Sequence, residues 1–382
     1  MSYVLPSRRA FADSITRIFL KYRQKDVEGT DGKPGELFPY QKLVRDYLLI
    51  ETPYRGLLLF HGLGSGKTCS AIAVAESLMS NKKVYVLLPA SLRANFIEEI
   101  RKCGDPVYIL DQHWMKKQIT SEEDRDTAKS LGITEEYLDK NGSYFMTVPE
   151  AAPNFRTLTR DQQKGIEAQV NDMINSRFHF INYNGIMESN VDKLLPSERM
   201  FDDSIVILEE AHNLISSVLS EREIKQKLYN MIYNATNCKV VALSGTPVIN
   251  RPQEIAFMMN LLRGPIERVT VPTKAAMAWD EALMTAFFRQ QKDVDTIEYN
   301  SVKHEIKITR NPPYFESVYN DKGDRIAVKY NKDYKQETDI RKWATEWKTE
   351  FETKFAGVEL LGEDKMGVEK LECLPTDFDG PQ

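Results

Sequence analysis

Between about residues 56 and 264, short apolar runs alternate with segments of helical periodicity. The apolar runs, each about the length of a strand, are 56–61, 84–89, 107–110, 178–183, 205–209 and 240–244. The helical segments lie near 67–80, 91–103, 162–176, 213–234 and 252–263. Unbroken apolar runs are typical of strands covered on both faces, and strand–helix alternation indicates parallel strands joined by right-handed crossovers. The pattern therefore predicts an α/β domain, a parallel sheet with helices on both faces.

The remaining segments follow other patterns. Residues 11–22 have the apolar spacing of an amphipathic helix, whereas residues 111–160 are polar and charged and are interpreted as a surface insertion. Two strand-like runs flank a turn at Lys322-Gly323, which predicts a β-hairpin. Residues 336–355 have the pattern of a charged amphipathic helix.

These patterns predict three regions along the chain. We expect an N-terminal helical extension at 1–35 and the α/β domain at 36–264. Residues 265–382 are interpreted as a linker and the start of a smaller α+β domain. The last residues, LECLPTDFDGPQ, do not resemble a closing element, so the expectation is a truncated N-terminal piece of a longer protein.

Composition bounds the class of protein without choosing a function. The 382 residues, 42% hydrophobic and 28% charged, fit a globular protein of two or three domains. A net charge of −5 gives no overall attraction to nucleic acid, although a binding groove needs only local Lys and Arg. No apolar run approaches the roughly 18–20 residues of a membrane span, and no signal peptide is evident. We expect an intracellular protein with no membrane partner.

The four cysteines are far apart in the sequence and form no Cys-x-x-Cys pair. They are Cys69, Cys103, Cys238 and Cys373. This spacing is typical of reduced intracellular thiols, and it predicts neither a disulfide framework nor a zinc site.

A glycine-rich segment joins the first apolar run to the helix that follows it. It is Gly62-Leu63-Gly64-Ser65-Gly66-Lys67-Thr68, and a preceding strand and a following helix are the setting of a phosphate-binding loop. Glycines let backbone N–H groups curl around a phosphate, and the helix N-terminus adds partial positive charge. Lys67 would neutralise β- and γ-phosphate oxygens and Thr68 would ligate Mg²⁺. The segment predicts ATP and Mg²⁺ as ligands; the alternative is a turn that binds nothing. The strict pattern has glycine where this chain has His61.

Two further motifs follow later strands. The run at 205–208 ends in Glu209-Glu210-Ala211-His212, and the run at 240–244 ends in Ser244-Gly245-Thr246-Pro247. In this order the three motifs resemble those of helicase superfamily 2 ATPases with a DEAH-type second motif, and the resemblance implies that the α/β domain at 36–264 is RecA-like. The resemblance implies that Glu209 holds Mg²⁺, Glu210 orients the attacking water, and His212 couples the nucleotide to Ser244, Gly245 and Thr246. A solvated acidic pair at a strand end is the alternative for Glu209 and Glu210.

The first acidic residue departs from that family, which has aspartate where this chain has Glu209. One additional methylene extends the carboxylate by roughly 1.5 Å, and a misplacement of about 1 Å can cost on the order of 100-fold in rate. Mg²⁺ demands near-ideal octahedral geometry. The longer side chain therefore puts the metal geometry, and with it the rate, in question.

The resemblance also implies roles for residues outside these motifs. Gln41 stands in a Tyr-Gln pair upstream of the loop, where similar ATPases recognise adenine, and its amide can both donate and accept. Pro89, Ala90 and Ser91, with Arg93, stand where similar proteins contact the nucleic-acid backbone. A surface glutamine, and a strand-to-helix turn with Ser91 as N-cap, are the alternatives.

Asn182 and Tyr183 end another apolar run, at 178–183, and are candidate nucleic-acid contacts. Tyr183 could stack on a base or a sugar, or it could pack in the core. The residues alone do not decide between these two interpretations, and both stay open at this point.

The segment at 244–263 resembles the Swi/Snf-like branch and the ATPases of large cytoplasmic DNA viruses, with IKITRNPPYF near 306–315 adding to the viral likeness. Within that group, the similarity is to the helicase-like subunit of the early transcription factor and to the poxvirus nucleoside triphosphatase. It implies an ATP-dependent helicase or translocase on nucleic acid, with DNA favoured over RNA and the viral transcription machinery as a candidate partner. The location would be the virion or the host cytoplasm.

Two alternatives remain, a transcription-factor subunit that uses ATP without separating strands and an assembly scaffold with a degenerate site. The family's second-domain arginine motif is absent from residues 265–382. Since arginine fingers are worth about 10³–10⁵ in rate, we expect this chain alone to bind nucleotide but to hydrolyse it slowly.

Overall fold

The computed structural model describes residues 1–22, 37–60, 62, 66–220, 223–274, 287, 290–337, 339–355 and 360–372. Contacts divide the chain into two compact units, each made of segments that are distant in the sequence. Unit 1 contains residues 1–21, 50–55 and 255–382, and unit 2 contains residues 22–49 and 56–254.

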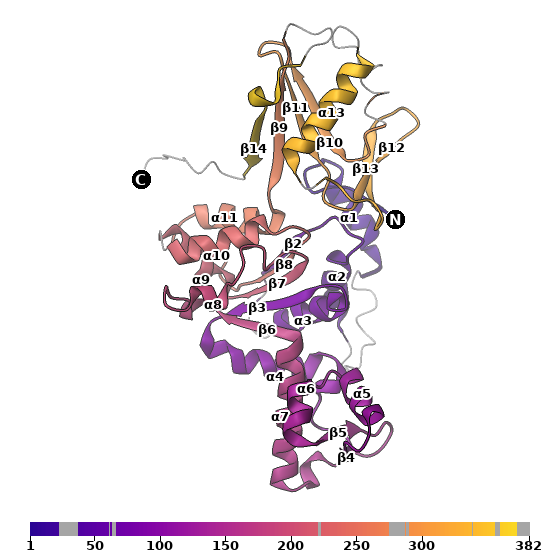
Figure 1. Cartoon of the computed structure of the whole chain (residues 1–382), viewed down its shortest axis with the longest axis vertical. Coiled ribbons are helices and arrows are strands. Elements are labelled where there is room, and N and C mark those ends of the chain that lie inside the picture. Colours follow the sequence, from indigo (N-terminus) through magenta and orange to yellow (C-terminus); the bar gives the residue numbers. More distant parts are fainter. Residues whose placement is uncertain are drawn as a thin grey trace. The chain divides into compact units, whose positions relative to one another are not determined.

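Unit 2 is built on a sheet of five parallel strands (Figure 1). The strands are β2 (Gly56–Leu59), β3 (Lys83–Leu88), β6 (Phe178–Asn182), β7 (Ser204–Glu209) and β8 (Lys239–Leu243). Their order across the sheet is β2-β8-β7-β3-β6. Nearly every residue of β3, β7 and β8 is buried, whichever face it points to. Both faces of the sheet are therefore covered, and the α/β, RecA-like prediction is confirmed.

Helices connect these strands. They are α2 (Pro39–Tyr47), α3 (Lys67–Leu78), α4 (Arg93–Cys103), α7 (Arg160–Arg177), α8 (Val191–Leu194), α9 (Ala211–Leu219) and α10 (Glu223–Asn234). After β8 the chain enters α11 (Gln253–Arg263), whose first two residues end unit 2 and whose other residues belong to unit 1. Short 3₁₀ turns are η1 (Leu20–Tyr22), η3 (Ala90–Leu92), η4 (Pro106–Tyr108), η5 (Phe155–Thr157) and η6 (Tyr183–Gly185). Local chemistry sets several of the ends. Thr159 and Gln162, for example, form a reciprocal capping box at the start of α7.

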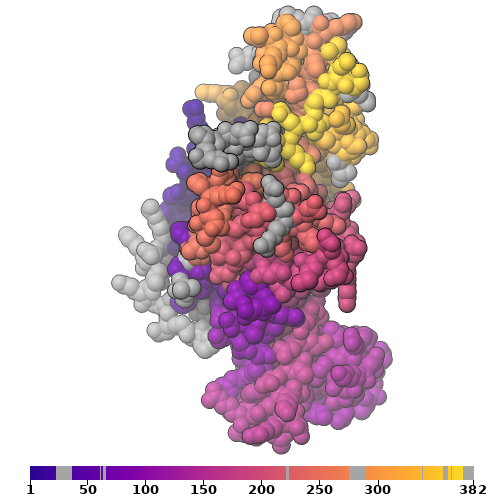
Figure 2. Space-filling model, turned by 90° about the vertical axis from the view of Figure 1, so that its left-hand side faces the viewer, coloured from indigo at the N-terminus to yellow at the C-terminus, as the bar shows by residue number. Residues whose placement is uncertain are grey.

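The polar stretch at 111–160 forms a small subdomain of unit 2. Its two antiparallel strands, β4 (Trp114–Gln118) and β5 (Ser143–Thr147), are joined by α5 (Glu122–Ser130) and α6 (Glu135–Asn141). Gln169 of α7 attaches it, because its amide accepts from Phe145 N at 2.7 Å and donates to Phe145 O at 2.8 Å. In Figure 2 these residues form the magenta lobe at the foot of the view.

Unit 1 contains two antiparallel sheets. One has the order β10-β11-β9-β14 and the other β1-β13-β12. The strands are β1 (Ser2–Tyr3), β9 (Ile266–Pro272), β10 (Val294–Asn300), β11 (Glu305–Arg310), β12 (Phe315–Tyr319), β13 (Arg325–Tyr330) and β14 (Gly367–Leu371). The helices are α1 (Phe11–Ile18), α13 (Ile340–Lys354) and the 3₁₀ turn η7 (Glu363–Lys365). The predicted hairpin is confirmed as β12–β13.

Helix α13 supplies the apolar side of the core of unit 1. Trp343, Trp347 and Phe351 recur every four residues, so they lie on one face of the helix and pack with Val269, Ile306 and other residues of the four-stranded sheet. The N-terminal residues join the same unit, because β1 pairs with β13. Nothing in the sequence pattern indicates this pairing. The linear boundaries near residues 35 and 264 stay a proposal for how the chain is organised.

Two predicted elements differ in the structure. The run at 107–110 is not a strand: Asp105 accepts a hydrogen bond from Val107 N and Pro106 occupies the first turn, so a 3₁₀ turn forms instead. The helix predicted over 213–234 is two helices, α9 and α10.

The prediction of four reduced cysteines is wrong. Cys69 and Cys103 form a disulfide, with Cα atoms 5.7 Å apart. They are 34 residues apart in the sequence, and the packing of α3 against α4 brings them together. Cys238 is a free, buried thiol, and Cys373 lies outside the described residues. Among the described helices, none is long and apolar enough to cross a membrane.

Candidate nucleotide-binding site

The strand order brings the predicted motifs together at one edge of the sheet. The glycine-rich loop follows β2, Glu209 ends β7, and Ser244 follows β8, and these three strands are neighbours in the order β2-β8-β7. Because parallel strands end at the same edge, the three motifs converge there, where α/β sheets bind their ligands. Pro89 and Asn182 end the other two strands, β3 and β6, at the same edge.

The start of α3 carries the described residues that are predicted to bind phosphate. Gly66 precedes the helix with φ +73°, a conformation that favours glycine, and a Cβ there would lie 2.8 Å from Gln41 Nε2. Lys67 and Thr68 are the first two residues of the helix, and Lys67 Nζ donates to Gly62 O at 3.1 Å. Leu63, Gly64, Ser65 and His61 lie outside the described residues.

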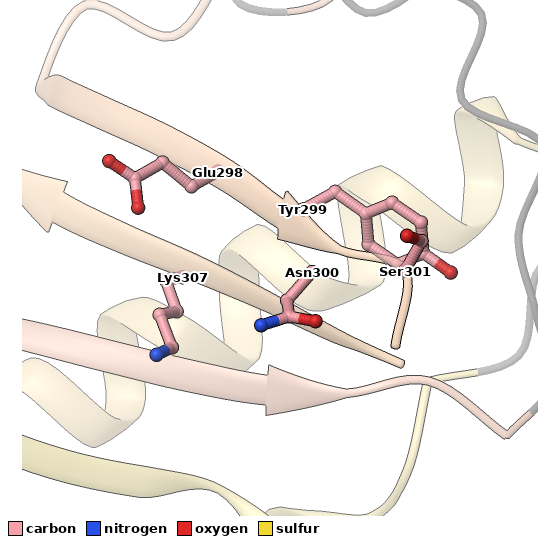
Figure 3. Close-up of a pocket in the computed structure, with 5 residues that line it drawn as sticks. All are labelled: Glu298, Tyr299, Asn300, Ser301 and Lys307. Atoms are coloured by element: carbon pink, nitrogen blue, oxygen red, sulfur yellow. The ribbon is translucent and has the colours of Figure 1, made fainter. Parts of the chain in front are cut away.

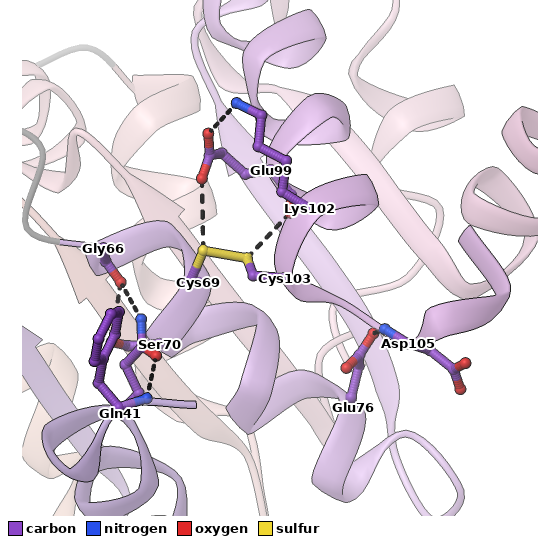
Figure 4. The surroundings of a disulfide bond; sticks show 10 residues. Gln41, Gly66, Cys69, Ser70, Glu76, Glu99, Lys102, Cys103 and Asp105 are labelled. Carbon is purple, nitrogen blue, oxygen red and sulfur yellow. Dashed lines mark hydrogen bonds and ion pairs between the residues drawn. A yellow bond between two sulfur atoms is a disulfide. The ribbon is translucent and has the colours of Figure 1, made fainter. Parts of the chain in front are cut away.

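Gln41 is buried and ties α2 to the loop. Its Oε1 accepts from Phe38 N at 2.9 Å, and its Nε2 lies 3.4 Å from Gly66 O (Figure 4). The alternative of a surface glutamine is therefore wrong, while the adenine role stays a proposal. Phe38 and Tyr40 are both exposed and their rings stack at 5.7 Å. Sequence reasoning missed this aromatic pair, although the Phe-Pro-Tyr-Gln string shows it.

Glu209 is the most strongly perturbed carboxylate of the site. Its pKa is raised to about 7, mainly by burial and in smaller part by the charge of the neighbouring Glu210, while Lys67 opposes the shift. Its Oε2 atom is buried, and among the described residues no hydrogen-bond partner reaches it. A buried carboxylate oxygen left unpaired is costly, so it needs a cation or a proton. This donor fits a Mg²⁺ ion beside a bound phosphate.

Glu210, His212 and Ser244 form a connected polar chain. Glu210 adopts a left-handed conformation with φ +50° and caps α9. His212 Nδ1 lies 3.3 Å from Glu210 Oε2 and 2.8 Å from Ser244 Oγ. Ser244 Oγ in turn accepts from Thr246 N at 3.1 Å. A displacement of the acidic pair can therefore reach the Ser-Gly-Thr segment through hydrogen bonds.

Tyr183 belongs to the core and not to a binding surface. Its ring is fully buried, and its hydroxyl lies 3.2 Å from the backbone oxygens of both Glu209 and Glu210. Burial raises the pKa of this hydroxyl well above its ordinary value, which keeps it a neutral donor. Stacking on a base is therefore not supported, because no face of the ring is open. Tyr183 instead positions the acidic pair from the end of β6, which β3 separates from β7.

The other predicted nucleic-acid contacts lie at the ends of β3 and β6. Ser91 and Arg93 are exposed, and Pro89 and Asn182 are half-buried. The Arg93 guanidinium donates to Asn175 Oδ1 at 2.9 Å and lies 5.0 Å above the Phe180 ring. Asn182 Oδ1 accepts from Asn184 N at 3.2 Å. The contacts of these four residues with nucleic-acid phosphates stay proposals.

Glu254 is a site residue that sequence reasoning missed. It is buried at the start of α11 and accepts from Ile249 N at 2.6 Å, from Asn250 N at 3.2 Å and from Ser216 Oγ at 2.6 Å. Burial alone would raise its pKa, but these hydrogen bonds lower it below the ordinary value. Glu254 thereby fastens the segment after Ser-Gly-Thr-Pro onto α9. In the sequence it is one acidic residue in an ordinary helix pattern.

A separate surface hollow of about 310 Å³ lies on unit 1 (Figure 3). It is lined by Glu298, Tyr299, Asn300, Ser301 and Lys307. None of the predicted site residues lines it.

Comparisons with known proteins place these features in a family context. The profile of one family, described as the SNF2-related domain, matches residues 40–292, more than half of the chain. A candidate ATP-dependent RNA helicase of Acanthamoeba polyphaga mimivirus is 30% identical over 58% of this chain and 32% of its own length. A candidate helicase of Invertebrate iridescent virus 3 is 27% identical over 65% of this chain and 22% of its own length.

A third relative is named as a termination factor and not as a helicase. A termination factor NPH-I homolog of African swine fever virus is 24% identical over 66% of this chain and 30% of its own length. The chain thus matches at most 32% of the length of these three relatives. All three come from large DNA viruses, as the sequence resemblance implies.

Proposed function

Because this chain belongs to the SNF2-related domain family, we propose that it is the ATP-binding part of a motor that moves along nucleic acid. ATP binding at the sheet edge would change the arrangement of the acidic pair and the Ser-Gly-Thr segment, and hydrolysis would reverse that change. Contacts to phosphates would make the binding tolerant of sequence.

One observation supports this proposal above the others, the polar chain Glu210–His212–Ser244. A site that only binds or hydrolyses a nucleotide needs Lys67 and the two carboxylates. It has no need of a buried histidine that joins the water-orienting carboxylate to a neighbouring strand end. Such a connection is what a motor requires, because the state of the nucleotide must be transmitted to the part that holds the track.

The residues present fit MgATP. Lys67 would hold the β- and γ-phosphates, Thr68 and Glu209 would hold Mg²⁺, and Glu210 would orient the attacking water. The ion would supply charge neutralisation at the developing phosphate oxygens. Glu209 is longer than the aspartate of similar ATPases, so we expect Glu209→Asp to be tolerated or to raise the rate, and Glu209→Ala to abolish hydrolysis.

We favour DNA over RNA as the track, and the viral transcription machinery as the partner. The relative named as a termination factor supports a role in transcription, whereas the relative named as an RNA helicase supports the other nucleic acid. Arg93, exposed at the start of α4, offers a positive charge for contacts with the nucleic-acid backbone. The location that follows is the virion or the cytoplasm of the host.

The test is steady-state ATP hydrolysis by the full-length protein without nucleic acid and with duplex DNA, single-stranded DNA or RNA, run beside a strand-displacement assay. The proposal predicts a slow basal rate that rises with duplex DNA. Stimulation without displacement identifies a translocase or a transcription factor, and stimulation with displacement identifies a helicase. A rate that no nucleic acid changes would contradict the motor proposal and favour the assembly scaffold with a degenerate site.

A further inference from the structure

The Cys69–Cys103 bond joins the nucleotide-binding helix to its neighbour. Cys69 is the third residue of α3, immediately after Lys67 and Thr68, and Cys103 is the last residue of α4. Both cysteines are partly exposed, so a small thiol can reach them. Figure 4 shows the bond beside Gly66, Ser70 and Gln41, the residues that hold the end of the phosphate loop.

The surroundings accommodate the reduced pair as well as the bond. Glu99 Oε2 lies 3.5 Å from Cys69 Sγ, and Glu99 O lies 3.0 Å from Cys103 Sγ. After reduction each thiol therefore has an acceptor already in place, since a thiol is a weak donor. Lys102 lies 3.0 Å from the same Glu99 side chain, so its charge is compensated. Neither redox state leaves a polar group in need of a partner.

A second connection between the two helices does not depend on the cysteines. Glu76, two turns further along α3, accepts from Asp105 N at 2.6 Å, directly after α4. The middle of α3 is also buried, with Ala71, Ile72, Val74 and Ala75 inaccessible. Opening the disulfide would therefore free the first turn of α3 and leave the helix pair in place.

We propose that Cys69 and Cys103 form a reversible thiol–disulfide site that sets the affinity of the phosphate loop for nucleotide. The bond restrains the turn that carries Lys67 and Thr68. The oxidised chain therefore loses less conformational entropy when it binds the phosphates. This inference rests on the proposed nucleotide site. It adds a control of that site which the motor function does not require.

A small thiol supplies the two electrons that reduce the disulfide. A thiolate of the reductant attacks one sulfur of the bond, the S–S bond breaks, and the released cysteine thiolate takes up a proton. A second thiolate of the reductant then attacks the reductant's sulfur in the mixed disulfide, that S–S bond breaks, and the second cysteine thiolate leaves and takes up a proton. The protein gains two thiols, and the reductant leaves as its disulfide. Oxidation is the reverse reaction, with a low-molecular-weight disulfide as the electron acceptor.

The experiment compares the full chain after treatment with a dithiol reductant and with the corresponding disulfide. Thiol alkylation followed by peptide mass analysis reports the state of Cys69 and Cys103, and calorimetry measures MgATP affinity. We expect the oxidised chain to bind MgATP at least about threefold more tightly. Equal affinities, with alkylation showing that the pair has interconverted, would overturn the proposal.

Variants separate this result from other effects. Cys69→Ser and Cys103→Ser should each bind like the reduced parent and should not respond to the reductant, whereas Cys238→Ser, which changes the buried free thiol, should keep the full response. A response that persists in both of the first two variants contradicts the assignment. If one of them fails to fold, the other and the alkylated parent give the same comparison. A folded chain that binds no MgATP in either state would instead refute the nucleotide site, and this inference with it.

Zinc provides the last control, because Cys69, Glu99 and Cys103 offer three ligand atoms within 4.8 Å of one another. Zn²⁺ alone is added to the reduced chain before the MgATP titration. The proposal predicts that zinc does not reproduce the affinity of the oxidised chain. If zinc restores that affinity and oxidation does not, these residues are a metal site and the redox assignment is wrong.

Discussion

Glu209 and Glu210 are adjacent in the chain but lie in different electrostatic surroundings. Burial raises the pKa of Glu209 to about 7, with a further contribution from the charge of Glu210. The Glu210 side chain is more exposed, and its Oε2 atom lies 3.3 Å from His212 Nδ1. The two carboxylates can therefore divide the work, one receiving a cation and the other orienting water. The sequence predicts that this pair stands at the end of a strand, as it does at β7, but it cannot show which carboxylate is buried.

The raised pKa of Glu209 predicts a pH-dependent site. Mg²⁺ needs the ionised carboxylate, so MgATP affinity should rise between about pH 6 and pH 8 as the proton is lost. Stability has the opposite sign. Between the ordinary pKa of 4.5 and about 7 the folded chain binds more protons than the unfolded one, so its unfolding free energy falls as pH rises through that window. Calorimetry and urea unfolding at several pH values measure both. Glu209→Gln should flatten both profiles, and unchanged slopes in that variant would show that another group titrates.

Lys67 should dominate the binding of the triphosphate. Lys67→Ala removes the charge next to the phosphates, and we expect MgATP affinity to fall about 100-fold, since hydrogen bonds between ionised groups are the strong ones. The melting temperature should stay within a few degrees, because Lys67 is partly exposed. Lys164→Ala, which removes an exposed lysine of α7, is the matched control and should bind like the parent. Parent-like affinity in Lys67→Ala would refute the phosphate role.

At the scale of elements, the segment that follows β8 and ends at Glu254 is linked to α9. Glu254 closes this link by accepting from Ile249 N, Asn250 N and Ser216 Oγ. The segment has exposed apolar residues, Val248 and Ile249 among them, so it has little packing of its own to hold it. The carboxylate is then the main restraint on the chain that follows Ser-Gly-Thr-Pro.

Glu254→Ala should therefore loosen that segment without removing the phosphate site. Hydrogen bonds to a charged group are each worth about 1.5–3 kcal/mol, so urea unfolding should show a loss of at least about 2 kcal/mol. MgATP affinity should change by less than about threefold, because Lys67 and the acidic pair are untouched. Glu167→Ala, at an exposed position of α7, should cost less than about 0.5 kcal/mol. A cost that small in Glu254→Ala as well would mean that the network is not a restraint.

The elements also show which features the sequence pattern predicts and which it does not. Five of the six predicted strands of the α/β domain form, because buried parallel strands must be apolar along their whole length. The sixth, at 107–110, fails because Asp105 and Pro106 favour a capped turn. Periodicity does not report such a local side-chain bond. The Tyr183 hydroxyl bonds and the Glu254 network depend on distances between elements, which no one-dimensional pattern contains.

For the whole molecule, contacts that join distant residues decide the organisation. The pairing of β1 with β13 places the first residues of the chain in unit 1, and the disulfide joins residues 34 positions apart. Both are products of the fold, so a sequence predicts them poorly. The motifs of the candidate site are predictable for the opposite reason. Each is local, and the rule that parallel strands end at one edge brings them together.

The central claim is that one site couples ATP to nucleic acid, and the affinity for duplex DNA with and without MgATP measures it most directly. Coupling free energies between linked sites are typically 1–3 kcal/mol, or about 5–150-fold. We predict at least about a fivefold change in DNA affinity when a non-hydrolysable ATP analogue with Mg²⁺ saturates the parent chain, and none in Lys67→Ala. The same DNA affinity in the parent with and without nucleotide would contradict the account, because ATP and nucleic acid would then bind independently.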